Sequence, residues 1–458
     1  MRTVQLLLFA SRALGRSNPG SAETCGLRPS TPFDSGPVCF PGPEYLSGQC
    51  QNGGDCASPR PHAWTRSSPC FQSAESEDRF CVFTDAAFAD GRGISLVTTA
   101  QRANHVATAP AFTNPELTKH LNQDLVQTVP ARHEVREIPG KGMGVVATAP
   151  IPRGALILAN TASILVDYRA YHTLPTAHYT DLQTHAAAHL PPAHRAALLN
   201  LSSHNPRTNP PADPADISGI LATNIFDIDF DTDIDIDIDI DLDLDPEDEE
   251  KEEESPTFAA LFPAIARLNH ACRPNADYRF DHAALAQSVR AARDIVPGEE
   301  ITVSYIDAVR PRAARVRRLK RGWGFECDCA LCVLEGGRQR EADERVGLIG
   351  EVKGVLGDWA WHGAGGEGTG MAELLVGLFE MERLWTVMHE AYALAALEFN
   401  AVGERWRAVK YARLAVEWGI PMVGDEDEDV EDMRELAGDP RGHWSWMRRV
   451  RNRDALAK

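Results

Sequence analysis

Short runs of apolar and β-branched residues alternate with glycine and proline turns between residues 132 and 166. Gly144-Val-Val-Ala-Thr-Ala follows a Gly-rich turn, and Ala155-Leu-Ile-Leu-Ala follows Ile151-Pro-Arg-Gly. Branched side chains pack well on a pleated surface, and Gly and Pro supply the turns that end strands. The pattern therefore predicts strands at 132–138, 144–149 and 155–159, and again near 276–280, 286–291 and 301–304.

Two Gly-rich turns lead into similar strands. Gly91-Arg-Gly-Ile-Ser-Leu-Val-Thr-Thr-Ala echoes Gly140-Lys-Gly-Met-Gly-Val-Val-Ala-Thr-Ala. Either the two strands pair in one sheet or the echo is a coincidence. We expect the first strand to dock onto the β-sheet of the folded region that begins near residue 132.

Helical patterns dominate two other stretches. Residues 177–203 place leucines among many alanines, and residues 340–420 contain Ala-rich amphipathic segments that suggest paired helices. Residues 309–321 are rich in arginine, and helical spacing puts these side chains on more than one face. A solvated helix explains them; docking of an acidic substrate tail or of the chain's own Asp run is the alternative.

Aspartate alternates with isoleucine or leucine over residues 227–245, which is formally the pattern of a strand. Like charges stacked across a ladder repel, so we interpret residues 205–256 as a flexible acidic insertion. Residues 227–254 carry eleven Asp, six Glu and one Lys, a net charge of −16 out of −20 for the chain. The rest is close to neutral, which gives no reason to expect nucleic acid as a partner.

The N-terminal region indicates a leader. Arg2 precedes the apolar run Val4–Ala10, which resembles a short signal peptide, and no run reaches the roughly 18–20 apolar residues of a membrane span. Six of the ten cysteines lie in the first 81 residues, without a C-x-x-C pair. This spacing favours disulfides in an oxidising compartment over zinc; unpaired thiols in a leader are the alternative. We expect a secretory or extracellular location, with a nuclear or cytoplasmic one as the alternative.

The residues that could take part in catalysis or binding follow one another along the chain in four motifs. A turn at Lys141-Gly-Met-Gly144 has the glycines that let backbone approach a ligand, although an ordinary hairpin needs them too. Residues 265–275 read Ile-Ala-Arg-Leu-Asn-His-Ala-Cys-Arg-Pro-Asn, and Gly298-Glu-Glu-Ile-Thr-Val-Ser-Tyr305 follows. Last comes Cys327-x-Cys329-x-x-Cys332, three thiols where a structural zinc normally has four ligands. A disulfide pair is the alternative to zinc.

In this order the motifs resemble the SET-domain protein methyltransferases over about residues 132–335, apart from the insertion. The layout is similar to the SET and MYND group and to fungal SET-domain proteins, but the C-x-x-C pairs of a MYND finger are not seen. Ala271 stands where the family often has serine. The resemblance implies an α+β fold of small β-sheets with a threaded C-terminal segment, followed by helices.

The resemblance also implies roles for individual residues. The cofactor S-adenosyl-L-methionine would contact Lys141, Gly142, Met143, Gly144, Asn269, His270 and Phe325, of which Phe325 would stack on the adenine. Tyr305 would be the catalytic tyrosine. Cys272 would complete a Zn²⁺ site with Cys327, Cys329 and Cys332.

The expected organisation follows from these assignments. We predict a leader and Cys-rich segment at 1–80, an extension packing on the SET domain at 81–131, the SET domain at 132–308, a post-SET zinc segment at 309–335 and helices at 336–458. The implied function is S-adenosylmethionine-dependent protein-lysine N-methylation of a histone or another protein. The alternatives are a catalytically silent SET-based interaction protein and a secreted disulfide-rich effector with a decayed SET core.

Overall fold

The computed structural model describes most of the chain beyond the predicted leader. The described residues are 64–74, 76–119, 121, 132–203, 216–229, 257–307, 309–360 and 367–456. Four of the six N-terminal cysteines, the apolar run Val4–Ala10 and the acidic residues 230–256 lie outside them.

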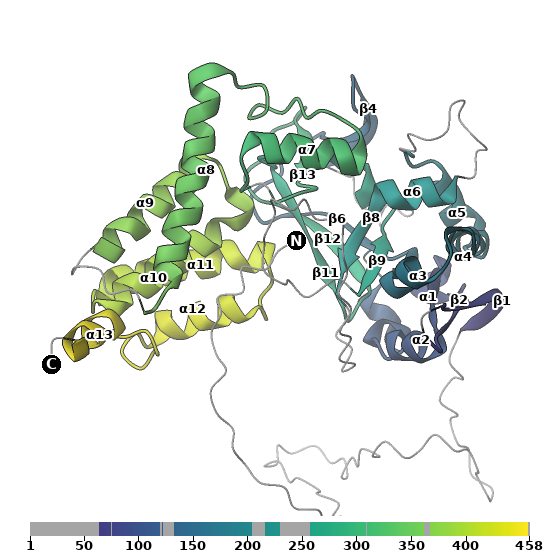
Figure 1. Ribbon diagram of the computed structural model, residues 1–458, viewed down its shortest axis with the longest axis horizontal. Coiled ribbons are helices and arrows are strands. Elements are labelled where there is room, and N and C mark those ends of the chain that lie inside the picture. The colour runs from purple at the N-terminus through teal and green to yellow at the C-terminus, as the bar shows by residue number, and fades with distance from the viewer. Residues whose placement is uncertain are drawn as a thin grey trace, which may run out of the picture. The chain divides into compact units, whose positions relative to one another are not determined.

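The largest sheet has six strands in the order β1-β2-β3-β7-β9-β8 (Figure 1). They are β1 (Thr65–Gln72), β2 (Arg79–Asp85), β3 (Ile94–Thr99), β7 (Ile164–Asp167), β9 (Phe258–Leu261) and β8 (Ile225–Ile228). Neighbouring strands are antiparallel except β3 and β7, which pair in parallel. The sheet thus joins strands from the region before residue 100 to strands after residue 160.

Two smaller sheets complete the β structure. A four-stranded sheet has the order β10 (Asn269–His270), β13 (Glu300–Val303), β5 (Gly142–Ala147) and β4 (His133–Ile138). A three-stranded sheet has the order β11 (Ala276–Asp281), β12 (Ala286–Ala291) and β6 (Leu156–Thr161). The six strands predicted in this region are all present within a few residues of their expected limits, and the α+β fold class is confirmed.

The echoing segments lie in different sheets. β3 pairs with β2 and β7, whereas β5 pairs with β4 and β13. The two echoing strands therefore do not pair with each other. The first strand does dock onto a sheet of the region 132–308, because β3 pairs in parallel with β7. Their likeness lies in the turn, because Gly91 and its counterpart Gly140, and Gly93 and its counterpart Gly142, all have positive φ.

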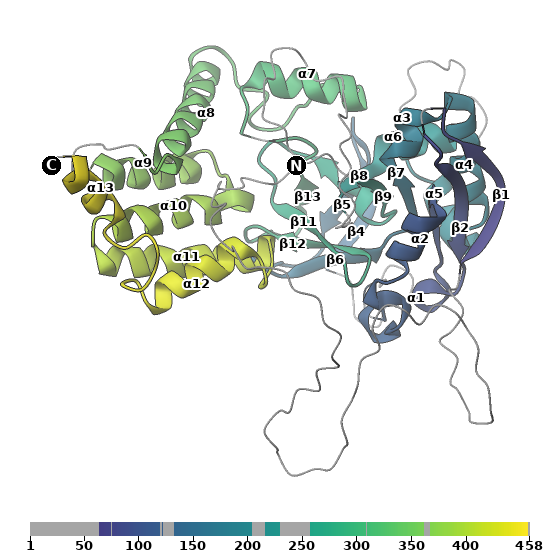
Figure 2. The ribbon, with the colours of Figure 1, turned by 60° about the horizontal axis from the view of Figure 1, so that its bottom comes forward.

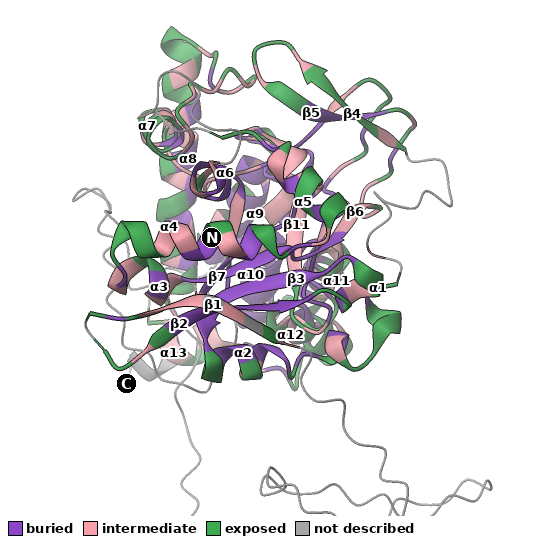
Figure 3. Ribbon diagram, turned by 90° about the vertical axis from the view of Figure 1, so that its right-hand side faces the viewer, coloured by how far each residue is buried: buried purple, intermediate pink, exposed green. Residues whose placement is uncertain are grey.

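Helices cover both faces of the six-stranded sheet at β2 and β3. Cys81, Phe83 and Leu96 pack in one apolar cluster with α2 (Ala100–Val106). The alternate residues Val82 and Val97 pack in another cluster with α4 (Thr176–Ala188). Alternating side chains point to opposite faces of a strand, so both strands are buried along most of their length (Figures 2 and 3).

The helix predicted over 177–203 is interrupted. It forms α4 and α5 (Pro192–Leu199), which follow α1 (Phe88–Gly91) and α3 (Tyr168–Thr173) in the chain. Pro191 and Pro192 separate α4 from α5 because proline donates no backbone hydrogen bond.

Part of the predicted acidic insertion is folded. Residues 216–229, inside the predicted limits, form α6 (Ile217–Asn224) and then β8. Asp216 caps α6 by accepting a hydrogen bond from the Gly219 backbone, and Ile217, Ile220 and Leu221 are buried. The prediction of flexibility is wrong for this apolar part, since its side chains join the core.

The C-terminal region is a group of helices (Figure 1). After α7 (Arg312–Trp323) come α8 (Gly336–Gly357), α9 (Glu367–Met381), α10 (Met388–Ala401), α11 (Arg405–Met422), α12 (Glu428–Gly438) and α13 (Arg448–Leu456). α10 is buried on almost every side and packs against α8, α9, α11 and α12. Among the described helices, none is both long enough and apolar enough to cross a membrane.

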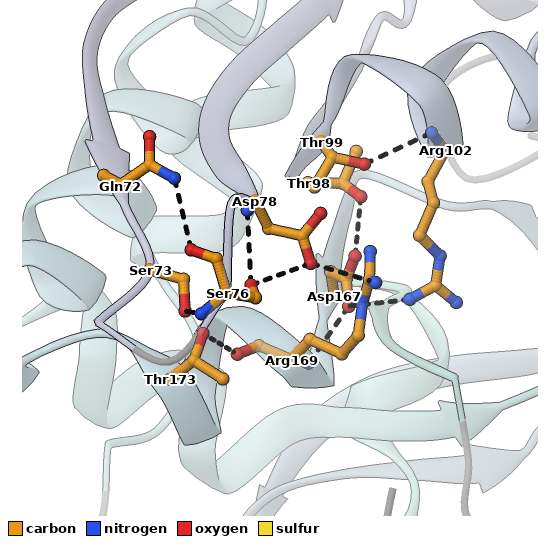
Figure 4. Close-up of polar contacts among 10 residues, drawn as sticks. All are labelled: Gln72, Ser73, Ser76, Asp78, Thr98, Thr99, Arg102, Asp167, Arg169 and Thr173. Atoms are coloured by element: carbon orange, nitrogen blue, oxygen red, sulfur yellow. Dashed lines mark hydrogen bonds and ion pairs between the residues drawn. The ribbon is translucent and has the colours of Figure 1, made fainter. Parts of the chain in front are cut away.

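A buried ionic network ties α2 to β7 (Figure 4). The carboxylate of Asp167 accepts hydrogen bonds from Arg102 Nη1 at 2.9 Å and from Thr98 Oγ1 at 2.7 Å. Arg169 donates its backbone N–H to Asp167 at 3.0 Å and lies 3.2 Å from Asp78. Burial lowers the pKa of Arg102, and the charge of Asp167 opposes that effect.

Candidate active site and cysteine cluster

Three distant parts of the sequence meet in the four-stranded sheet. The short strand β10 pairs in parallel with β13, with Asn269 opposite Thr302 and His270 opposite Val303. β13 pairs on its other edge with β5, which begins in the Gly-rich turn. This arrangement brings the turn, the Asn-His pair and the segment before Tyr305 to one place.

The Gly-rich turn has an open outer side and a crowded inner side. Gly142 has a φ of 76°, and a Cβ built there meets nothing within 4 Å. At Gly144, by contrast, a Cβ would lie 2.7 Å from Asn269 Nδ2. Glycine at 144 therefore lets Asn269 approach, and glycine at 142 leaves backbone accessible to a ligand.

Glu300 holds two predicted cofactor residues. Its Oε1 accepts a hydrogen bond from Asn269 Nδ2 at 2.8 Å, and its Oε2 lies 3.2 Å from Lys141 Nζ. Lys141 Nζ also lies 3.6 Å from Oδ1 of Asp328, the residue between Cys327 and Cys329 in the sequence. Burial alone would lower the pKa of Lys141, but Glu300 and Asp328 raise it overall. Glu300 was not predicted, although it stands in the Gly298-Glu-Glu-Ile motif.

Tyr305 and His270 are joined through the backbone. Tyr305 donates its N–H to His270 Nδ1 at 3.0 Å and its hydroxyl to the Leu268 carbonyl at 2.7 Å. Since Nδ1 accepts, the ring proton of neutral His270 belongs on Nε2, which lies 3.3 Å from Cys272 Sγ. Burial lowers the pKa of His270 to about 4 and raises that of Tyr305, so both rings are neutral at physiological pH.

Aromatic rings surround Tyr305. The Trp323 ring centroid lies 5.2 Å from that of Tyr305, and the Phe325 centroid lies 6.4 Å from it. Trp323 donates its indole N–H to the Thr223 carbonyl of α6 at 3.2 Å. Gly324, with a φ of 72°, ends α7 between these two rings. Trp323 was missed in the sequence because nothing local distinguishes it from a tryptophan that packs a helix end.

The four cysteines predicted to bind metal lie together. The sulfur atoms of Cys272, Cys327, Cys329 and Cys332 are all within 4.8 Å of one another. Cys272 lies 3.5 Å from Cys332 and 4.0 Å from Cys327, and all four cysteines are free of disulfides. Zn–S bonds of about 2.3 Å in a tetrahedron would put sulfurs about 3.8 Å apart. The cluster can therefore hold one metal ion.

A buried cation accompanies the cluster. Arg315 is 1% exposed. Burial works against its charged form, yet the thiols of Cys272 and Cys332 raise its pKa overall. Four thiolates around a divalent ion carry a net charge of −2, and a neighbouring guanidinium offsets half of it. This charge balance fits a metal ion with four thiolate ligands.

The cluster is also tied to the C-terminal helices. Arg273, next to Cys272, donates to Glu382 at 2.8 Å. The same buried carboxylate accepts from Arg345 of α8 at 2.6 Å. One shared acidic group thus connects the Cys272 segment to α8 and to the end of α9.

Residues 142–306 match the protein family described as "SET domain". The chain contains a SET domain. The matched segment includes Gly142, Gly144, Asn269, His270, Cys272 and Tyr305, and it ends before Phe325 and the other three cysteines. The SET resemblance predicted from the motifs is confirmed.

Curated relatives match a limited stretch around the SET domain. "N-lysine methyltransferase SMYD2-B" of Danio rerio is 47% identical over 78 residues, 17% of this chain and 17% of that protein. "Histone-lysine N-methyltransferase SMYD3" of Homo sapiens is 36% identical over 112 residues, 22% of this chain and 25% of that protein. The chain therefore spans a quarter or less of these relatives.

A solved structure of the SET domain of LSMT bound to lysine and AdoHcy is 12% identical to this chain. It covers 74% of this chain and 95% of its own, with a TM-score of 0.26.

Proposed function

We propose that the protein is an S-adenosyl-L-methionine-dependent protein-lysine N-methyltransferase. The observation that supports this most is the meeting of the Gly142 turn and Asn269 in one small sheet inside the SET domain, with Tyr305 directly after its strand β13 and bonded to His270 of β10. The names of the relatives, which are lysine methyltransferases, agree with the proposal.

In this proposal the Gly-rich turn and Asn269 bind the methyl donor. The open side of Gly142 leaves backbone groups accessible, while Glu300 fixes the Asn269 amide and the Lys141 ammonium. S-adenosylmethionine, when bound, supplies a methyl group on a positively charged sulfur. Lys141 and Asn269 offer donors for the carboxylate and polar edges of such a molecule.

Tyr305 acts by position rather than as a base. Its raised pKa keeps the phenol protonated, and its hydroxyl is held by the Leu268 carbonyl. A neutral phenol offers oxygen lone pairs to orient the attacking amine. The surrounding rings of His270, Trp323 and Phe325 exclude water, and an apolar environment favours the neutral, nucleophilic form of a substrate lysine.

We further propose that Cys272, Cys327, Cys329 and Cys332 hold Zn²⁺ as a structural ion. The ion would fix residues 325–332 beside the donor site, because the backbone of this segment has little regular structure of its own. Phe325 and Asp328, which faces Lys141, would then be held in place by the metal site.

Methyl transfer by the purified full-length protein tests the proposal. With isotopically labelled donor and a panel of proteins that includes histones, we expect label on lysine. Tyr305→Phe should lower the rate at least tenfold while S-adenosylhomocysteine still binds in calorimetry. Tyr171→Phe, at an exposed tyrosine of α3, is the matched control and should keep full activity.

Two results would contradict the proposal. Absence of labelling together with absence of calorimetric donor binding would exclude an enzyme of this class. Donor binding without labelling, combined with normal biological function of Tyr305→Phe, would favour the catalytically silent alternative.

A further inference from the structure

The chain contains a single sequence that can accept an asparagine-linked glycan. Asn200-Leu-Ser202 fits N-x-Ser/Thr, and none of the other thirteen asparagines stands two residues before serine or threonine with a residue other than proline between. The question is whether this tripeptide lies on the surface and whether the chain meets the compartment where glycans are added.

The structure places Asn200 on an exposed turn. Asn200 follows α5 and Ser202 follows it, and both side chains are exposed while Leu201 between them is buried. Among the described residues, the carboxamide of Asn200 has no hydrogen-bond partner. A glycan at this position would leave the packing of the turn unchanged.

Side chains from two other segments of the chain hold the backbone of this turn in place. Arg267 donates to the Asn200 carbonyl at 2.7 Å, and Asn224 donates to the Ser202 carbonyl at 2.6 Å. The anchors use main-chain carbonyls only, so the two side chains that define the acceptor stay directed to solvent.

An independent feature indicates an oxidising environment. Cys70 and Cys81 stand opposite each other on β1 and β2 and form a disulfide. Stable disulfides are rare in proteins of the cytosol and nucleus and common in secreted ones. The other four thiols of the described residues form the cysteine cluster for which we propose Zn²⁺ coordination, and a thiolate bound to a metal ion is not available to pair in a disulfide.

We propose that Asn200 is N-glycosylated and that the protein passes through the secretory pathway. The co-reactant is an oligosaccharide linked to a lipid through pyrophosphate. The amide nitrogen of Asn200 bonds to the anomeric carbon and loses one proton. The bond from that carbon to the pyrophosphate oxygen breaks, and the lipid pyrophosphate leaves with the electron pair.

This inference is independent of the proposed methyl transfer. The full chain, with its own N-terminus, is expressed in a eukaryotic cell line, and its electrophoretic mobility is compared before and after treatment with peptide-N-glycosidase F. We expect one enzyme-sensitive shift, and conversion of residue 200 to aspartate in the treated peptide by mass spectrometry.

Variants locate the modification. Asn200→Gln and Ser202→Ala should each abolish the shift, whereas Ser202→Thr should keep it because threonine also completes the acceptor sequence. Asn104→Gln, at an exposed asparagine outside any acceptor sequence, is the matched control and should keep it. Two variants that remove the acceptor guard against a folding defect in one of them.

Three results would overturn the inference. The first is a secreted protein whose mobility the enzyme does not change. The second is a shift that survives both Asn200→Gln and Ser202→Ala. The third is an unglycosylated protein found only in the cytosol or nucleus.

Discussion

At the scale of single residues, the site depends on side chains that each contact two other functional residues. Glu300 is bonded to Asn269 and Lys141, and His270 lies between the Tyr305 backbone and Cys272. The motifs predicted Asn269, His270 and Lys141, because families are defined by such residues. They did not predict Glu300 as the shared partner, since its role appears only when β13 lies next to β10.

Replacing Glu300 with glutamine should weaken donor binding about tenfold, because a lost charge-assisted hydrogen bond costs roughly 1.5 kcal/mol. Glutamine keeps the size of the side chain but leaves Lys141 without the closer of its two anionic partners. Calorimetric titration with S-adenosylhomocysteine measures the effect. Glu351→Gln, at an exposed position of the C-terminal helix α8, is the control and should bind normally. Equal affinities for the Glu300→Gln variant and the natural protein would refute the positioning role.

The buried imidazole of His194 should make stability depend on pH. Burial, reinforced by Arg92, lowers its pKa to about 4, and its two nitrogens contact the Arg92 carbonyl and Ser163. The unfolded chain binds a proton near the ordinary value of about 6.5, before the folded chain does. The contribution of neutral His194 to the free energy of unfolding is therefore fully present above about pH 6.5, and it is lost as the pH falls towards 4. Urea unfolding between pH 6.5 and pH 4 measures the loss of stability, and His194→Gln should make that loss smaller. The same dependence of stability on pH in His194→Gln and in the natural protein would show that His194 is not its source.

At the scale of helices and strands, local patterns predicted what local chemistry determines. Glycine turns followed by β-branched runs located β5, β6 and β11–β13 to within a few residues. The Pro191-Pro192 pair indicates a helix break, but the many alanines around it led to the prediction of one continuous helix. Residues 216–229 were missed because the neighbouring acidic repeat masked an apolar segment that packs only through contacts with distant strands.

The end of α7 allows two glycines to be compared on one helix. Gly324 has a φ of 72°, so Gly324→Ala should destabilise the protein by about 1 kcal/mol and disturb Trp323 and Phe325 beside it. Gly322 lies inside the helix with open space around a built Cβ, so Gly322→Ala should stabilise it by about 0.5–1 kcal/mol. Opposite shifts in thermal unfolding are expected. A stabilising Gly324→Ala would show that the left-handed cap is not formed.

At the scale of the whole molecule, ionic contacts join regions that the sequence presents as separate. Arg102 and Asp167 connect the region before residue 121 to the SET domain, and Arg273, Glu382 and Arg345 connect the cysteine cluster to α8. None of these pairs was predictable, because each joins residues more than 30 positions apart. From the sequence alone, a single charged residue is expected to lie on the surface in contact with water. Charge pairing over such distances depends on the assembled sheets.

The buried pair in Figure 4 tests whether the region before residue 121 and the SET domain unfold as one unit. Arg102 is 2% exposed, and its Nε and Nη2 have no hydrogen-bond partner, so Asp167 is its main compensation. Breaking a buried pair from one side costs about 3–5 kcal/mol, and Asp167→Asn should cost that much in urea unfolding.

Asp181→Asn, at a half-buried aspartate of α4 that pairs with the partly exposed His185, is the matched control for Asp167→Asn and should change stability by less than about 0.5 kcal/mol. Because β3 and β7 share a sheet, fluorescence and far-ultraviolet circular dichroism should report one coincident transition in both proteins. Separate transitions, or a loss at Asp167→Asn no larger than the control's, would mean that the two regions fold independently and that the pair contributes little.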